Sequence, residues 1–166
     1  ESAVVPMTVR IAGRLARATF LVAVVLFFAS PAAAADITWT GVNACPARLA
    51  QGPDGRIYVT DPVAGSVFIY SSSLTQVGEI HGVDSPLGIA VDSQNRIFVG
   101  SASAKHIKIY SCDGELIGVV AEGQVEMPND MAFDLEGNLY VADSRRNHVA
   151  VFDAGLALAR TIGTGG

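Results

Sequence analysis

The sequence predicts an all-β fold, a β-propeller built of four-stranded antiparallel blades, and three observations support this prediction. Three segments beginning at Pro46, Pro86 and Pro128 align with one another at spacings of 40 and 42 residues. Each segment holds short apolar stretches of strand length, separated by clusters of turn residues. No segment outside the N-terminal leader has the 3.6-residue period of an amphipathic helix. A repeat of about 40 residues with four strands is typical of a propeller blade.

Each repeat is expected to supply its four strands in order. In the second repeat the predicted strands are GIAVD (88–92), RIFVG (96–100), HIKIY (106–110) and LIGVV (116–120). The third strand alternates apolar and polar residues as a half-buried strand does. An Asp-Gly pair at Asp113 and Gly114 predicts the last hairpin. The three blades are assigned to residues 46–85, 86–127 and 128–166.

The residues before the repeats are expected to direct export. Residues 1–6 precede Met7 and are interpreted as upstream sequence. Residues 7–35 contain basic residues, an apolar run from Thr19 to Ala29 and a small-residue site at Ala33–Ala35, the order of a signal peptide with a helical core that is cleaved near Ala35. The apolar run is shorter than the roughly 20 residues of a membrane span. We expect a secreted or periplasmic protein without membrane association after cleavage; the alternative is an uncleaved anchor.

The charge balance excludes nucleic acid as an expected partner. The chain has a formal net charge of −5, and 8 of its 11 basic residues but 15 of its 16 acidic residues follow residue 35. Binding to phosphates requires a basic face, which such a chain lacks.

Residues 36–45 are assigned as a lead-in strand segment before the first blade.

The repeats resemble NHL repeats, which end in an Ala-Asp-Ser turn followed by Asn-x and an apolar-aromatic strand. The third repeat is the best match, because its segment VADSRRNHVAVFD has Asn147, His148 and Val149 where the family name has Asn-His-Leu. The second repeat departs from the pattern with Gly100-Ser101 and with Lys105 at the Asn position. The first repeat has Gly65 at that position. The resemblance implies a six-bladed, TolB-like propeller in an exported protein of bacterial type, and it implies no single activity.

Three blades are fewer than the roughly four to eight of closed propellers. The last residues, TIGTGG, have the composition of a connector between blades. We therefore expect the chain to be an N-terminal fragment whose remaining blades come from the same gene. The alternative is that a second copy of the chain supplies them and closes the ring.

The sequence places one candidate ligand site at the mouth of the central channel. Asn129 and Asp130 follow Pro128 at the start of the innermost strand, and Arg48 and Gly88 occupy the position of Asp130 in the other repeats. The Pro-Asn-Asp segment resembles those of gluconolactonase-like propellers, which implies a divalent ion such as Ca²⁺ held by Asn129 and Asp130. Ca²⁺ requires six to eight oxygens, more than one blade supplies. The alternative is that both side chains bond only to local backbone N–H groups.

Other polar residues recur and are expected to be structural. Asp61, Asp143 and Asn147 lie in the connection between the second and third strands, where Asx side chains accept backbone hydrogen bonds. The recurring positions assigned to the scaffold are Pro46, Pro86, Pro128, Asp61, Asp143 and Asn147. His106 and His148 occupy equivalent positions, and His81 lies in a connector, so no histidine pairs with a nucleophile. The basic pair Arg145-Arg146 is expected in a solvated loop.

The two cysteines are not expected to form a disulfide. Cys45 precedes the innermost strand of its blade, while Cys112 lies in the hairpin between the third and fourth strands, at the opposite end of a blade. A five-residue strand spans roughly 17 Å, whereas a disulfide requires Cα atoms within about 7 Å.

The function expected from these patterns is a non-catalytic binding or scaffold module for a protein, peptide or glycan partner, without a cofactor. The recurring residues are apolar or turn-forming, and residues able to carry chemistry do not converge. The alternative is a metal-assisted lactonase or related hydrolase of the gluconolactonase-like type, with Ca²⁺ at Asn129 and Asp130. Fold alone does not separate these two classes.

Overall fold

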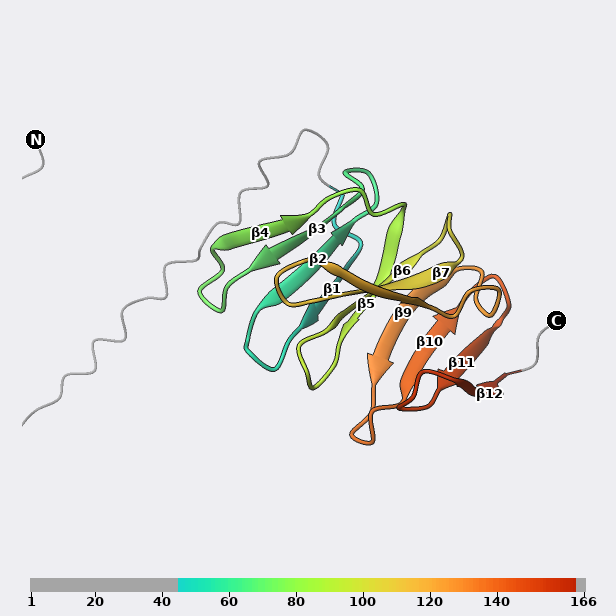
Figure 1. Cartoon of the computed structure of the whole chain (residues 1–166). Helices are drawn as coiled ribbons and strands as arrows, with labels where there is room; N and C mark the ends of the chain where they lie inside the picture. Colours follow the sequence, from blue (N-terminus) through green and yellow to red (C-terminus); the bar gives the residue numbers. More distant parts are fainter. Residues whose placement is uncertain (1–44, 164–166) are drawn as a thin grey trace, which may run out of the picture. The chain divides into compact units, whose positions relative to one another are not determined.

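The computed structural model describes residues 45–163 and shows three four-stranded antiparallel sheets (Figure 1). Blade 1 consists of β1 (Arg48–Gln51), β2 (Ile57–Asp61), β3 (Ser66–Tyr70) and β4 (Gln76–Ile80). Blade 2 consists of β5 (Pro86–Val91), β6 (Ile97–Ser101), β7 (His106–Tyr110) and β8 (Leu116–Val120). Blade 3 consists of β9 (Pro128–Phe133), β10 (Leu139–Asp143), β11 (His148–Phe152) and β12 (Leu158–Ile162).

The first strands of successive blades lie side by side, as the innermost strands of a propeller do. β1 contacts β5, and β5 contacts β9, while the strands within each blade pair in chain order. We call the end where β1, β5 and β9 begin the mouth end, and the opposite end the far end. The predicted all-β propeller fold is confirmed. The residues from 45 to 163 include no helix able to cross a membrane; the signal-peptide helix and most of the lead-in segment fall outside the described residues.

The blades are held together by two apolar layers, each formed by side chains that alternate along the strands. Between blades 1 and 2, Tyr58 and Val67 pack against Ile97 and Val99, all at 0% exposure. Between blades 2 and 3 the packed residues include Phe98, Ile107, Met131, Leu139 and Val141. Successive blades therefore present opposite faces to each other, and each layer is made of residues at matching repeat positions.

The Asn position of the NHL pattern is a left-handed turn residue. Asn147 has φ 55°, and the equivalent Gly65 and Lys105 have φ 63° and 56°. Glycine takes this conformation without cost, and asparagine tolerates it better than other residues with a side chain. The structure thus explains why glycine replaces asparagine in blade 1, and it identifies Lys105 as a strained residue in blade 2.

The Gly100-Ser101 departure of blade 2 also has a structural cause. Pro128 of blade 3 lies directly on Gly100, and a Cβ built there would come within 2.7 Å of the Pro128 carbonyl oxygen. Alanine, the residue of the NHL pattern, does not fit beneath this proline. Ser101 in turn donates a 2.5 Å hydrogen bond to the Asp84 carbonyl oxygen of the preceding connector.

The strand limits differ slightly from those expected in blade 2. The first strand begins at Pro86 and ends before Asp92, and the second begins at Ile97 instead of Arg96. The reason is the Asp92 side chain, whose Oδ1 accepts hydrogen bonds from the backbone N–H groups of Gln94 (2.9 Å) and Arg96 (2.8 Å) and holds both residues in the turn.

Candidate functional site

The structure brings together two of the residues predicted at the channel mouth. Arg48 in β1 and Asp130 in β9 approach to 3.9 Å between Nε and Oδ1, with side chains 41% and 64% exposed. Asn129 is half-buried beside them, at the start of β9. Asn129 and Asp130 therefore lie at the beginning of the innermost strand of blade 3, and Arg48 at the beginning of that of blade 1.

The gap that Arg48 and Asp130 bridge is created by Gly88. This glycine occupies the same repeat position in β5, between the two charged residues, and is buried. A Cβ there would lie 2.8 Å from the Pro128 carbonyl oxygen and 3.1 Å from the Asp130 backbone nitrogen. Close packing of β5 against β9 thus requires glycine, and it leaves the mouth end without a side chain from blade 2 at this level.

The described residues do not by themselves fit a Ca²⁺ ion at this mouth. Asn129 and Asp130 offer oxygen atoms, but the nearest charged partner of Asp130 is the Arg48 cation. Ca²⁺ requires six to eight oxygen ligands and no cation among them. Within residues 45–163 there is no group of three or more His, Cys, Asp or Glu side chains that could hold a metal.

The recurring aspartates hold the connectors that lead into their own blades. Asp143 is 1% exposed and accepts hydrogen bonds from the backbone N–H groups of Glu126 (2.7 Å) and Met127 (3.0 Å). Asp61, equally buried, accepts one from Cys45 N (2.6 Å). Burial favours the neutral form of Asp143, but hydrogen bonds from four backbone N–H groups outweigh it and lower the pKa of this carboxyl group.

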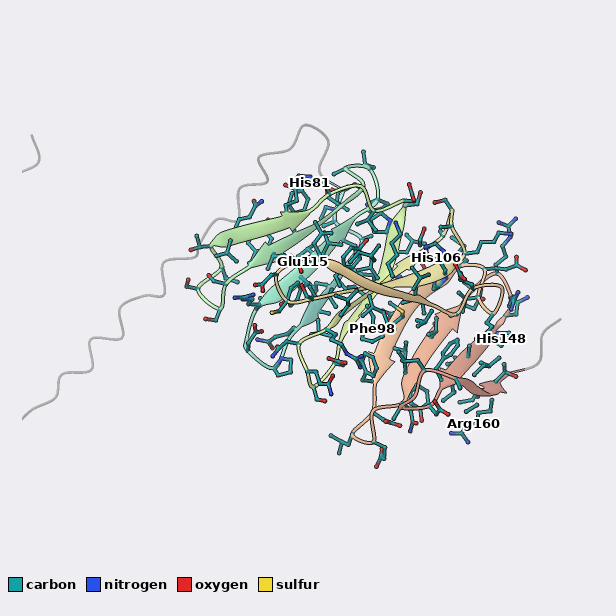
Figure 2. The ribbon with its side chains drawn as sticks, viewed as in Figure 1. His81, Phe98, His106, Glu115, His148 and Arg160 are labelled. Carbon is teal, nitrogen blue, oxygen red and sulfur yellow. The ribbon has the colours of Figure 1, made fainter. Side chains whose placement is uncertain are left out.

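The other sequence candidates do not form a site. His81, His106 and His148 lie apart from one another (Figure 2). Cys45 is exposed, Cys112 is half-buried, and both are free thiols. That they stay unpaired in the purified protein remains a prediction, and a Cys45–Cys112 peptide in non-reducing mass mapping would contradict it.

The pair Arg145-Arg146 is divided between two roles. Arg146 is half-buried and donates hydrogen bonds to the carbonyl oxygens of Gly123 (3.0 Å) and Gln124 (2.5 Å), so it fixes the connector before blade 3. Arg145 is exposed and lies 3.8 Å from Glu126.

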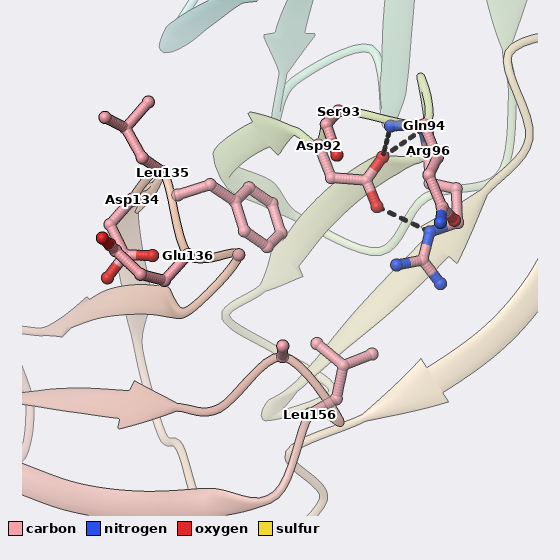
Figure 3. A pocket seen from close by; sticks show the side chains of 11 residues that line it. Asp92, Ser93, Gln94, Arg96, Asp134, Leu135, Glu136 and Leu156 are labelled. Atoms are coloured by element: carbon pink, nitrogen blue, oxygen red, sulfur yellow. Dashed lines mark hydrogen bonds and ion pairs between the residues drawn. The ribbon is translucent and has the colours of Figure 1, made fainter.

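A cleft of about 340 Å³ opens at the far end, between blades 2 and 3 (Figure 3). We call it the far-end cleft. It is lined by the β5–β6 turn (92–94 and 96), the end of β9 with the β9–β10 turn (133–137), and residues 154 and 156 of the β11–β12 hairpin. All residues that line the cleft belong to blades 2 and 3, which the structure describes. Leu135 stands fully exposed at its edge.

The two charged residues on the blade 2 side neutralise each other. Arg96 donates from Nε to Asp92 Oδ2 at 2.6 Å, and Asp92 is only 7% exposed. The Arg96 guanidinium also lies 5.4 Å from the centre of the Phe98 ring. These contacts hold the arginine on its own blade.

Blade 3 contributes a carboxylate in a fixed position. Asp134 accepts hydrogen bonds from the backbone nitrogen and the side-chain amide of Asn138, both at 2.8 Å. The Asn138 side chain is the largest cause that lowers the pKa of Asp134, so this carboxylate is ionised at neutral pH. Beside it, the Phe133 ring contacts Phe98 edge to face at 4.9 Å between ring centres.

Comparison with known proteins supports the family as well as the fold. No protein-family model matches the chain. The human NHL-repeat-containing protein 4 is 27% identical over 112 residues, which cover 64% of this chain and 89% of that protein. The chain is a β-propeller whose blades are similar to NHL repeats. The resemblance predicted from the sequence is thus supported, with three blades in the described residues.

Solved structures share the fold of this NHL-type chain. Hydrazine synthase of Kuenenia stuttgartiensis matches with a TM-score of 0.64 and 20% identity, over 76% of this chain and 38% of that one. A chain of a nidogen/laminin complex matches with a TM-score of 0.64 and 24% identity, over 71% and 48%. The chain therefore spans less than half the length of these two neighbours, one named as a synthase and the other solved in a protein complex.

The far-end cleft of these NHL-type blades was not expected from the sequence. One signal was present in the repeat alignment, because Asp92 stands where blade 1 has Gly52, while Arg96 and Arg56 are equivalent. The carboxylate of Asp92, which blade 1 lacks at this position, offers Arg96 an ion-pair partner that the equivalent Arg56 does not have there. The fully exposed Leu135 of the β9–β10 turn carried no sequence signal, since turn leucines are also found packed against a core.

Proposed function

We propose that this NHL-type propeller is a non-catalytic binding or scaffold module, and that its far-end cleft receives part of a protein, peptide or glycan partner. The observation that carries the proposal is the position of Leu135, a large apolar side chain fully exposed at the edge of a cleft with charged walls. Interfaces combine such an apolar anchor with a polar rim.

The cleft is also held in one shape, which lowers the entropic cost of binding. Asp92 fixes the β5–β6 turn through two backbone hydrogen bonds and Arg96, and Asp134 fixes the β9–β10 turn through Asn138. Loops positioned by a rigid scaffold are common places for binding. A neighbour solved within a nidogen/laminin complex agrees with protein binding in general.

We further propose that the module acts outside the cytoplasm, after cleavage near Ala35, as part of a propeller completed by further blades. N-terminal sequencing of the exported protein tests the first point, with Asp36 as the expected first residue. A mature protein that retains Met7 would contradict cleavage.

The binding proposal is tested by affinity capture from the extracytoplasmic fraction of the source cells. We expect at least one partner that the wild-type protein captures and that is reduced about tenfold by Leu135→Asn. The matched control is Val63→Asn, which changes another exposed turn residue, 63% exposed, far from the cleft. Capture that is equal for all three proteins would overturn the assignment of the cleft.

The alternative function, a metal-assisted lactonase or hydrolase, is favoured by the oxygens of the half-buried Asn129 and the exposed Asp130 at the channel mouth. Arg48 and Gly88 disfavour it, for the reasons given above. Thermal unfolding of the purified protein with Ca²⁺ and with EDTA, together with a lactone hydrolysis assay, separates the two functions. A Ca²⁺-dependent rise in melting temperature that Asp130→Asn removes would support the alternative.

A further inference from the structure

We propose that the far-end cleft recognises a peptide segment in which a lysine or arginine adjoins a large apolar side chain. This inference rests on the proposed function and names the chemistry of its partner. It is carried by the charges that remain uncompensated in the cleft, by the apolar side chains beside them, and by a comparison with the equivalent place between blades 1 and 2.

The uncompensated charge of the cleft is negative. Of its four charged residues, Asp92 and Arg96 form a pair at 2.6 Å and cancel. Asp134 and Glu136 remain, two residues apart on the β9–β10 turn, and among residues 45–163 the Glu136 side chain has no ion-pair partner. An acidic partner would be repelled by these two carboxylates, and a cationic side chain would be attracted.

The Asp134 carboxylate is oriented before any partner arrives. Its two oxygens accept hydrogen bonds from the backbone and side chain of Asn138, and the Tyr140 side chain and the Glu136 backbone also donate to it. Asp134 therefore contributes a fixed negative charge to the cleft. Asn138 occupies the repeat position of Arg56 and Arg96. Blade 3 therefore has an amide where the other two blades have a cation, and this exchange leaves its turn acidic.

The apolar part of the site lies on the same turn. Leu135 is fully exposed between the two acidic residues, and Leu156 and Phe133 line the cleft below it. Figure 3 shows Leu156 at the bottom of the view, on a different loop from the Asp134 turn. A partner that brings a cation to Asp134 and Glu136 thus also brings its neighbouring residue within reach of these apolar side chains.

The equivalent place between blades 1 and 2 is bridged by an arginine, beside a smaller pocket of about 250 Å³. Arg56 donates from Nη1 to the Cys112 carbonyl oxygen of the next blade at 3.0 Å, and so bridges the two turns. Arg96 is the equivalent residue, but Asp92 holds it on blade 2, whereas blade 1 has Gly52 at the position of Asp92. Arg56 reaches the next blade although its Nε also lies 3.4 Å from Asp54 Oδ2, whereas the contacts of Arg96 are with Asp92 and Phe98 of its own blade.

The test uses a random heptapeptide library displayed on phage and the purified protein. We expect the wild-type protein to enrich peptides with Lys or Arg next to Leu, Ile, Met or Phe. Glu136→Lys should recover at least tenfold fewer of these phage. Glu122→Lys is the control, because it makes the same charge change at an exposed residue of the mouth end.

Three results would overturn the inference: no enriched peptide class, a consensus without a basic residue, or equal recovery by Glu136→Lys. Each of these is distinct from failure of the proposed function. If affinity capture depends on Leu135 while the phage result is negative, the cleft binds a partner of different chemistry. If capture does not depend on Leu135, the proposed function itself is wrong.

Discussion

Arg48 Nε and Asp130 Oδ1 lie 3.9 Å apart, across the position that Gly88 occupies in the blade between them. The three residues are equivalent in the repeat, so this contact joins the innermost strands of blades 1 and 3. Because Gly88 of blade 2 has no side chain, the charged side chains of blades 1 and 3 can approach each other across it.

The Arg48–Asp130 contact is expected to contribute little to stability. Both side chains are solvent-exposed, and exposed ion pairs typically contribute about 0.2–1 kcal/mol or less. Arg48→Gln, Asp130→Asn and the double variant form a cycle whose coupling, measured by urea denaturation, should not exceed about 0.5 kcal/mol. A coupling several times larger would contradict this account of the mouth as an open, hydrated site.

Gly100→Ala is expected to destabilise the protein by about 1–3 kcal/mol, because the added methyl group would overlap Pro128 of the next blade. The control is Gly118→Ala in β8, where the nearest atom to the added carbon is 3.7 Å away in ordinary contact. Urea denaturation of both variants measures the difference. Equal stability of the two variants would show that blades 2 and 3 do not pack as closely as described.

Asp143→Asn is expected to lower the free energy of unfolding by about 2–4 kcal/mol at pH 7, since it removes a buried charge and replaces one of the two acceptor oxygens by an N–H donor that faces backbone N–H groups. The folded pKa of Asp143 lies below its unfolded value. Its contribution is therefore fully present above the ordinary Asp pKa of about 3.9, and is lost as pH falls through the lower folded pKa.

The wild-type and Asp143→Asn stabilities, measured from pH 7 to pH 2, should accordingly differ by a constant amount above about pH 5 and converge at lower pH. Asp113→Asn, at an exposed hairpin residue, is the control and should follow the wild type. A difference that stays constant down to pH 2 would exclude an ionised Asp143 as the cause.

Lys105→Asn is expected to stabilise the protein by about 0.5–1 kcal/mol, because asparagine tolerates φ 56° better than lysine. Lys105→Ala is the matched control: it removes the same charge but retains the backbone strain, and should bring no gain. Thermal unfolding measures both. A gain that is equal in the two variants would assign the effect to charge.

The blades could be predicted from the sequence because their information is local and repeated. Alternating apolar residues and the turn around Asn147 recur at fixed spacing, so each copy supports the others. The far-end cleft could not be predicted in this way. It depends on the acceptors that each turn arginine reaches. Arg96 binds Asp92 on its own blade, whereas the equivalent Arg56 reaches the Cys112 carbonyl oxygen of the next blade and also lies near Asp54. Competition between acceptors of similar strength is decided by side-chain geometry, which the repeat pattern does not contain.

At the channel mouth, the sequence predicted the positions of the residues but not the contact between them. The sequence correctly placed Asn129 and Asp130 at the start of the innermost strand, because the repeat register fixes strand ends. It named Arg48 at the equivalent position, but only the structure shows that Arg48 reaches Asp130 over Gly88.

Hydrogen–deuterium exchange of the protein, alone and with the partner recovered by affinity capture, tests the central claim most directly. The account predicts slower exchange on binding in the two turns that line the far-end cleft, residues 92–96 and 133–137, with the mouth end unchanged. Protection confined to the backbone around Arg48 and residues 129–130, with no change in those turns, would contradict it.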